Sequence, residues 1–562
     1  MNLRFNPSCR IAAAGILAAA VSITPLSAFH NKTAGTESAN EETGHPVTRS
    51  ADKDFIKAFH LVRPLERDDR EAGKTDKKKE KTEPTYKRRV GRALAEFGLV
   101  MAYNQTRYWI QYSKFIEDWQ YRLTWKDQRR RFFTLEAVRF DSNNFSLNWT
   151  HTFAGVLYYN FARTNNLSWP QSFLFSMGGS LWWEYMAEWR EVISINDNIM
   201  TGFGGFAAGE AWYQLGKYFA GHKGLFNSIL AFTNPAMKLN QWFNRKNGKY
   251  PSLGPEPAWH EFRMFVGRKS LSASTGTGNQ GTLFTGFHTQ FIQVPEYGKP
   301  GRSQRMITDT LASEIDLDFA HRRGKLEEIN FFSRVAGLGY YVQNIDETSS
   351  GYAYYIGLVS GFTLFKKRPV WIFDQTPAAI NQGVDLRLNE PRDFRDKLAI
   401  VQIAGPTIDY TAFAPNSKLR FVFDATLDFG LINSFALNKY SISGDISGFK
   451  STLLYYGYYY GLGTTVSSGF SCQTRGLELN GHLKYQAYGS LEGRDRFQKQ
   501  ITDDVHVKDS RVSYGLGAAV RIPGTPVELM GAYEGIDRRG VIRDIHHRRL
   551  ENRVSFFLSY TF

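Results

Sequence analysis

From residue 259 to the end of the chain, apolar and polar residues alternate with a period of two. In the segment 311–319 the odd positions are mostly apolar and the even positions are mostly acidic. The segments 418–429 and 477–486 repeat the pattern, with basic and acidic residues at the polar positions. Because strand side chains alternate between two faces, each segment predicts a β-strand with one apolar face and one face in contact with water.

The last segment, Arg553–Phe562, is the clearest of these strands. One face of this strand carries Val554, Phe556, Leu558, Tyr560 and Phe562. The segment resembles the closing strand of a bacterial outer-membrane β-barrel, in which a terminal phenylalanine is an assembly signal. The resemblance implies an outer-membrane location and the barrel assembly machinery as a partner.

A soluble β-sandwich also alternates, but its outer faces are polar and carry few aromatic residues. Here aromatic residues make up 15% of the chain while the mean hydropathy is −0.38. This combination is typical of a barrel whose strands expose a single apolar face. Allowing about 25 residues for each strand with its connection, residues 258–562 predict an antiparallel transmembrane barrel of about 12 strands, with about ten or fourteen as the alternatives.

Ahead of the barrel the apolar period changes to three and four residues. Residues 89–131 predict amphipathic helices, and residues 132–220 predict a small α-helical unit. Residues 221–257 have the proline and glycine punctuation of a linker. The predicted fold class is therefore mainly β, with a helical unit before the barrel.

The N-terminal residues 1–28 have the layout of a secretory signal peptide, with Arg4 and Arg10 before an apolar stretch and a small-residue cleavage site. Residues 29–88 are poor in apolar residues and predict a flexible charged tether. Cys9 falls within the predicted signal, so the mature chain would keep Cys472 alone and form no internal disulfide.

The chain is basic, with a formal net charge of +15. This excess suits contact with the anionic phosphates of outer-membrane lipid and lipopolysaccharide. No RNA- or DNA-binding motif occurs, and an exported chain rarely meets nucleic acid, so nucleic acid is excluded as a partner.

The candidate chemistry lies in the predicted helical unit. The candidate catalytic residues are His151, Glu184, Glu188 and Asp197, and the supporting residues are Asn148, Arg163, Ser194, Asn196 and Glu210. Glu184 and Glu188 are four residues apart and share a helix face. Ser194 is a candidate N-cap with Asp197 at the capping-box position. Gly205 and Gly209 have the spacing that lets helix backbones approach closely.

The same region carries an ordered series of motifs, which are Asn144, His151, Gly155, Tyr158-Tyr159-Asn160, Ala162-Arg163, Ser172, Gly179-Ser180, Trp183-Glu184, Glu188, Ser194-Ile195-Asn196-Asp197, Gly204-Gly205 and Gly209-Glu210. In these motifs, residues 132–220 resemble the domain-of-unknown-function family 3943 of bacterial envelope proteins. The first helix of that family usually opens with a His-Pro-aromatic-His-Gly run. This chain has His151-Thr152-Phe153-Ala154-Gly155 there and lacks the second histidine.

The sequence leaves three interpretations of these candidate site residues open. In the first, His151 is a general base acting on a water or a lipid hydroxyl, with Ser180 or Ser194 as nucleophile candidates. In the second, one histidine and several carboxylates hold a divalent cation that binds phosphate groups; no other cofactor is indicated. In the third, the groups satisfy one another inside an apolar bundle, with Glu184 paired to Arg163.

Two functions follow from these predictions. One is an outer-membrane β-barrel protein of unknown activity with a helical periplasmic or lumenal plug, connected with envelope lipid or with transport. The alternative is an outer-membrane hydrolase that modifies lipid or lipopolysaccharide with the helical constellation. The sequence does not decide whether the chain is an enzyme.

Overall fold

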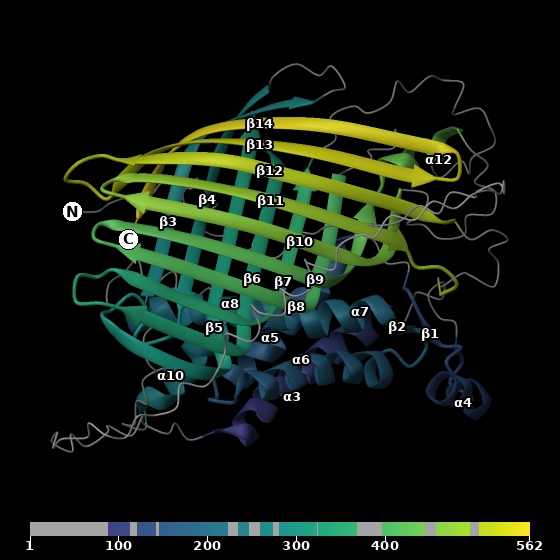
Figure 1. The fold of residues 1–562 in the computed structure, drawn as a ribbon. Helices are drawn as coiled ribbons and strands as arrows, with labels where there is room; N and C mark the ends of the chain where they lie inside the picture. The colour runs from purple at the N-terminus through teal and green to yellow at the C-terminus, as the bar shows by residue number, and fades with distance from the viewer. Residues whose placement is uncertain are drawn as a thin grey trace, which may run out of the picture. The chain divides into compact units, whose positions relative to one another are not determined.

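The computed structural model describes residues 88–112, 121–141, 145–222, 234–246, 259–273, 280–322, 324–367, 396–443, 457–494 and 505–561 (Figure 1). The predicted signal peptide, nearly all of the predicted tether and the terminal Phe562 lie outside these residues.

Twelve strands of the described chain close into one antiparallel barrel. They are β3 (Trp259–Ala273), β4 (Gln280–Ile292), β5 (Gly301–Arg322), β6 (Lys325–Ile345), β7 (Gly351–Lys367), β8 (Asp396–Ala414), β9 (Ser417–Asn433), β10 (Tyr458–Thr474), β11 (Leu477–Ser490), β12 (Val507–Arg521), β13 (Val527–Ile542) and β14 (Ile545–Thr561). The last strand pairs with the first, with Ser559 opposite Phe265, so the ring has no open edge. The predicted barrel of about 12 strands is confirmed.

The inner face of the wall is identified by contacts between strands that are not neighbours. Arg420 of β9 lies 2.9 Å from Glu314 of β5, and Arg553 of β14 lies 3.3 Å from Glu328 of β6. Such pairs can form only across the lumen, so the polar face points inward. The opposite face exposes large apolar side chains such as Leu516, as the outward face of a membrane barrel does.

The helices before the barrel begin with α3 (Val90–Tyr112) and α4 (Trp125–Phe133). The helical unit, as we use the term below, comprises α5 (Phe145–Arg163), α6 (Trp169–Trp182), the π-helical turn η2 (Trp183–Ala187), α7 (Ile195–Ile199), the π-helical turn η3 (Met200–Gly204) and α8 (Gly205–Gly221). A short parallel pair, β1 (Val138–Arg139) with β2 (Ile193–Ser194), flanks it, and α10 (Pro235–Lys246) follows it. No helix within the described ranges is long and apolar enough to cross a membrane.

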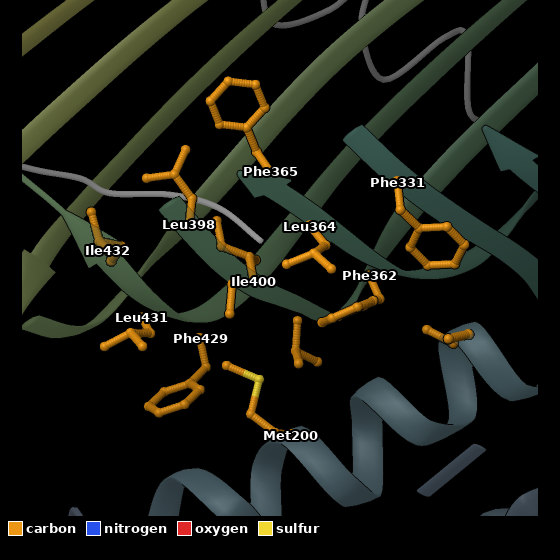
Figure 2. Packing of buried hydrophobic residues seen from close by; sticks show 14 of the residues in the cluster. Met200, Phe331, Phe362, Leu364, Phe365, Leu398, Ile400, Phe429, Leu431 and Ile432 are labelled. Atoms are coloured by element: carbon orange, nitrogen blue, oxygen red, sulfur yellow. The ribbon is translucent and has the colours of Figure 1, made fainter. Parts of the chain in front are cut away.

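The helical unit packs on the outer face of the barrel wall, along one side of the strands (Figure 1). In β9, Leu427 and Phe429 point to the same outward face, yet Leu427 is 53% exposed while Phe429 is 0% exposed. Figure 2 shows why: Met200 of η3 lies against Phe429 and Leu431. Trp212 of α8 meets Phe331 of β6 with ring centroids 6.1 Å apart. The expectation that these helices plug the lumen is therefore wrong.

The lumen instead receives α12 (Phe435–Ser443), a helix in the connection between β9 and β10. The Phe435 ring lies 4.3 Å from the Arg538 guanidinium and 5.0 Å from that of Arg549, both on the inward face of the wall. Arg538 also donates a hydrogen bond of 3.1 Å to the Asn433 carbonyl. This is the end of the barrel at which β7, β9 and β11 end and β8, β10 and β12 begin.

The wall beneath the helical unit is irregular. The register shifts in four successive strand pairs, from β5–β6 through β8–β9. At the first shift, between Ile307 and Thr310, the Thr308 carbonyl accepts a 3.0 Å hydrogen bond from the Trp169 indole at the start of α6. The β-bulges thus free backbone groups that the helices then satisfy.

Candidate functional site

The site is positioned by a close crossing of α5 with η3 and α8. A methyl group built on Gly155 would lie 2.8 Å from the Gly205 Cα, so no side chain fits between the two backbones. Ser176 of α6 closes the crossing, because its hydroxyl donates to the Thr201 carbonyl at 2.6 Å. Gly209 lies one turn further along, against the Tyr159 ring. The predicted close approach of helix backbones is confirmed at Gly205, whereas at Gly209 the neighbour is a side-chain ring.

A polar cluster lies at one end of this crossing; it consists of Asp141, His151, Glu184, Glu188, Ser194, Asn196 and Asp197. Its centre is the start of α7. The Ser194 hydroxyl accepts a hydrogen bond from the Asp197 backbone N–H at 3.1 Å, which is the predicted N-cap. The Asn196 amide donates to Asp197 Oδ1 at 2.8 Å, and its own oxygen accepts from the Asp141 backbone N–H at 2.9 Å.

His151 of α5 reaches this centre from the facing helix. Its Nε2 lies 3.4 Å from Asp197 Oδ2, and about a fifth of its side chain, 21%, is exposed. Burial lowers the pKa of His151 to about 4, although the neighbouring Asp141 opposes the shift. The imidazole is therefore uncharged at neutral pH and can accept a proton.

Glu184 and Glu188 enter the cluster from the π-helical turn η2 and its end. The Ser194 backbone N–H donates to Glu184 Oε2 at 2.7 Å, and the Trp183 indole donates to Glu188 Oε1 at 2.7 Å. Burial raises the pKa of both carboxyl groups well above their ordinary value, and each is raised further by neighbouring carboxylates. The surroundings of both acids therefore favour their protonated form.

Arg131 supports the cluster from α4 and is fully buried. Its guanidinium donates to the backbone carbonyls of Glu184, Tyr185, Glu188 and Glu191. These carbonyls lie at the end of η2, where the helical hydrogen bonds are interrupted. A single cation thus satisfies the backbone that presents the two glutamates.

Arg163 and Glu210 form a second cluster, away from the first. Arg163 Nε and Nη2 bind the two Glu210 oxygens at 2.8 and 3.1 Å. Tyr159 and Thr310 also donate to Glu210, at 2.6 and 2.9 Å, and Thr310 belongs to β5. The expected pairing of Arg163 with Glu184 is wrong, because the α5–α8 crossing gives Arg163 to Glu210 and turns that pair toward the barrel wall.

Of the predicted site residues, the structure therefore brings together His151, Glu184, Glu188, Ser194, Asn196 and Asp197, and it places Arg163 and Glu210 elsewhere. Asn148 lies on α5, but its side chain is outside the described atoms. The two nucleophile candidates have other contacts: Ser180 donates to the Asp197 carbonyl at 3.3 Å, and Ser194 donates to Asn196 Oδ1 at 3.0 Å. Within the described ranges, no three His, Cys, Asp or Glu side chains form a set that could hold a metal ion.

The sequence analysis did not predict that Asp141 and Arg131 contribute to the polar cluster. Asp141 joins the cluster because β1 pairs with β2, and a two-residue pairing leaves no periodic signal. Arg131 belongs to a run of three arginines, and nothing in the run distinguishes the buried one. The order of motifs along the chain identifies the region but not these two contacts.

The closed barrel and its outward apolar faces define a protein of the outer-membrane β-barrel class. Residues 137–236 match the family model described as Domain of unknown function (DUF3943), which confirms the predicted resemblance. A comparison with curated proteins finds no match.

The chain is also similar to solved structures of an outer-membrane protein, an autotransporter β domain and a hydrocarbon channel. A loop-deletion mutant of OmpT from Vibrio cholerae is 7% identical, with a TM-score of 0.22 over 54% of this chain and 99% of its own. The β domain of the Bordetella autotransporter BrkA is 11% identical, with a TM-score of 0.22 over 54% of this chain and 98% of its own. A mutant of the TodX monoaromatic hydrocarbon channel is 9% identical, with a TM-score of 0.23 over 55% of this chain and 91% of its own.

Proposed function

We propose that this protein is an outer-membrane β-barrel that holds its helical unit, with the polar cluster, between the barrel wall and the membrane lipid. The observation that carries the proposal is the position of the helical unit on the outward face, where a barrel otherwise meets acyl chains. The proposed partners are outer-membrane lipid and lipopolysaccharide.

The side of α6 that faces away from the bundle supports lipid contact. Leu174, Leu181 and Trp182 are exposed there, while Ser172 and Ser176 on the opposite side are buried. Contiguous exposed apolar side chains are costly in water and mark a surface that another apolar phase covers. In an outer-membrane protein whose helices lie on the lipid side of the wall, that phase is the acyl-chain region.

The lumen does not favour a transport function. Ion pairs bridge the lumen between strands that are not neighbours, among them Arg263 of β3 with Glu478 of β11, and α12 enters the lumen at one end. A wide aqueous channel needs an unobstructed interior. We therefore place the function at the outer wall and not in free diffusion through the barrel.

The proposal is tested by spin labelling of the full chain in lipid vesicles. Both cysteines, Cys9 and Cys472, are replaced, and single cysteines are introduced at Leu174, at Leu516 and at Glu347. Leu174 and Leu516 are similarly exposed, at 65% and 64%, and Leu516 is the lipid standard on β12. Glu347, in the turn before β7, is the water standard.

We expect the Leu174 label to be accessible to oxygen and shielded from a water-soluble nickel chelate, as the Leu516 label should be. A Leu174 label that behaves like the Glu347 label would overturn the proposal.

The hydrolase is a second candidate, and the His151–Asp197 pair is the observation that favours it. An uncharged imidazole can take a proton from a water or lipid hydroxyl, and Asp197 would stabilise the imidazolium that forms. The test compares the outer-membrane lipids of cells making wild-type protein, His151→Ala or His506→Ala at equal folded levels. His506, which is exposed, is the matched control. A lipid species that depends on His151 alone supports the hydrolase, whereas identical lipids in all three strains exclude it.

A further inference from the structure

A polar cavity of about 530 Å³ lies inside the barrel. Its lining comes from β5, β6 and β7 on one side and from β9 to β13 on the other, with Phe265 of β3 between them. In the ring of twelve strands β11 lies six strands from β5 in either direction, so these two strands face each other across the lumen. The cavity is of the size that holds a small solute.

The carboxylates that line this cavity already have basic partners. The pairs and their closest atoms are Glu314–Arg420 at 2.9 Å, Asp424–Arg334 at 2.8 Å, Asp316–His288 at 2.5 Å, Asp318–Lys269 at 3.6 Å and Glu534–Arg553 at 3.2 Å. A cationic ligand would have to compete with a side chain at every one of these positions. These five acids are therefore poorly suited to bind a free cation.

Strands β10, β11 and β12 contribute basic and uncharged polar side chains to the lining. Lys484 of β11 points into the cavity, and its ammonium lies 5.0 Å from the Phe332 ring centroid. Among the described residues, no carboxylate lies within ion-pair distance of Lys484. Arg511 lines the cavity from the neighbouring strand β12; it donates to the Ser513 hydroxyl at 3.1 Å and lies 5.7 Å from the Phe365 ring.

The rest of the lining from β10, β11 and β12 supplies hydrogen-bond donors without negative charge, and the lining acids Asp424 and Glu534 lie on the flanking strands β9 and β13. Beside the two cations, the cavity lining here includes Ser467, His482, Gln486 and Ser513. β10 contains no Asp or Glu, and on β11 and β12 the acids Glu478 and Asp509 lie outside the cavity lining. An ammonium and a guanidinium with adjacent amide and hydroxyl donors match the oxygen atoms of a carboxylate or phosphate group.

We propose that this cavity is a binding site for a small oxyanion, a solute carrying a carboxylate or a phosphate group, held by Lys484 and Arg511. The anion supplies Lys484 with the negative partner that the described chain does not provide. Because the lining acids are paired with their own bases, they do not cancel this attraction.

The test is calorimetric titration of the full folded chain in detergent with sodium phosphate and with sodium acetate, at constant ionic strength. Lys484→Gln removes the ammonium at similar size, and Lys484→Arg retains a positive charge. Lys325→Gln is the matched control, since Lys325 is exposed at the start of β6. Heat-modifiable migration in gels verifies that each barrel is folded.

We expect saturable binding of at least one anion by the wild type, an affinity at least tenfold weaker in Lys484→Gln, and affinities within about threefold of wild type for the other two variants. Preference for phosphate or for acetate then identifies the group. If Lys484→Gln does not fold, Arg511→Gln takes its place with the same expected loss. Absence of saturable binding by the wild type, or equal affinity in the wild type and the folded variant, overturns the proposal.

Discussion

The backbones of Gly155 and Gly205 touch where α5 crosses the junction of η3 and α8. A methyl group on Gly205 would lie 2.6 Å from the Gly155 Cα, well inside the distance that carbon atoms tolerate. This contact sets the distance between the helices that carry His151 and Asp197. The polar cluster therefore depends on two residues that have no side chain.

Gly155→Ala should destabilise the helical unit by about 1–3 kcal/mol, because the helices must separate to admit the methyl group. Gly178→Ala, in α6, is the control, since a methyl group there would meet no atom within 4 Å; it should leave the stability unchanged or raise it by up to about 1 kcal/mol, because alanine is the better helix former. Urea unfolding followed by tryptophan fluorescence measures both, as most of the 12 tryptophans precede the barrel. Equal effects of the two substitutions on stability would contradict the close backbone contact between Gly155 and Gly205.

Glu210→Gln should lower the free energy of unfolding of the helical unit by about 3 kcal/mol, because Arg163 would stay buried without its carboxylate. Burial opposes ionisation of Glu210, yet Arg163 and three hydrogen-bond donors lower its pKa to about 2. The pair therefore stabilises the protein above the ordinary glutamate pKa, and the stabilisation is lost as pH falls toward 2.

The measurement is acid unfolding of wild type and Glu210→Gln, where only the wild type should lose stability through this window. Asp309→Asn is the control, because the exposed Asp309 contacts the same arginine from the outside and should contribute about 0.5 kcal/mol at most. A Glu210→Gln variant that keeps the wild-type acid profile would contradict the role of the pair.

His151→Gln should remove a second pH dependence. Because the folded-state pKa of His151 is about 4, below its ordinary 6.5, the unfolded chain binds the proton more readily. Stability from His151 is therefore complete above pH 6.5 and is lost as pH falls toward 4, by about 2 kcal/mol after allowance for the exposed fifth of the ring. Unfolding curves at pH 7 and pH 4.5 measure the difference. If the stability of His151→Gln falls between pH 7 and pH 4.5 by as much as that of the wild type, another group titrates in this pH range.

Glu184 should make stability depend on pH in the opposite direction, and Glu184→Gln should remove that dependence. Burial raises the pKa of Glu184, so the folded state holds the proton and the stability from this group declines as pH rises above the ordinary glutamate value. A glutamine keeps an oxygen that can accept the Ser194 N–H and cannot ionise. We expect the variant to be more stable than wild type at pH 8, by about 1 kcal/mol, and equal to it at pH 4. Lower stability of Glu184→Gln at both pH values would mean that the ionised carboxylate is required.

The strands were predictable because most lumen-facing positions are polar or charged and alternate with apolar outward positions. Glu314, Asp316 and Asp318 alternate with apolar residues, and this pattern alone assigns the two faces of β5. The position of the helical unit was not predictable, because a wall residue covered by lipid and one covered by a helix are both apolar. Leu427 and Phe429 have the same sequence signal and different surroundings.

Within the site, the local features were predictable and the distant pairings were not. The Ser194 cap of Asp197 depends on three-residue spacing, which the sequence displays directly. Arg163 pairs with Glu210 because of the angle at which α5 and α8 cross, and no spacing along the chain encodes that angle. Arg131 was missed for the same reason, since its acceptors are carbonyls that any residue carries.

The location of the helical unit on one side of the wall also limits how copies of this protein can be arranged beside one another in a membrane. Strands β10 to β14 keep a bare outer surface, with Phe470, Leu516 and Phe556 exposed, whereas part of the outward side from β5 to β8 is covered by helices. Two barrels can meet wall to wall through the bare strands. A neighbour that approached the covered part of β5 to β8 would meet the helices instead of the wall.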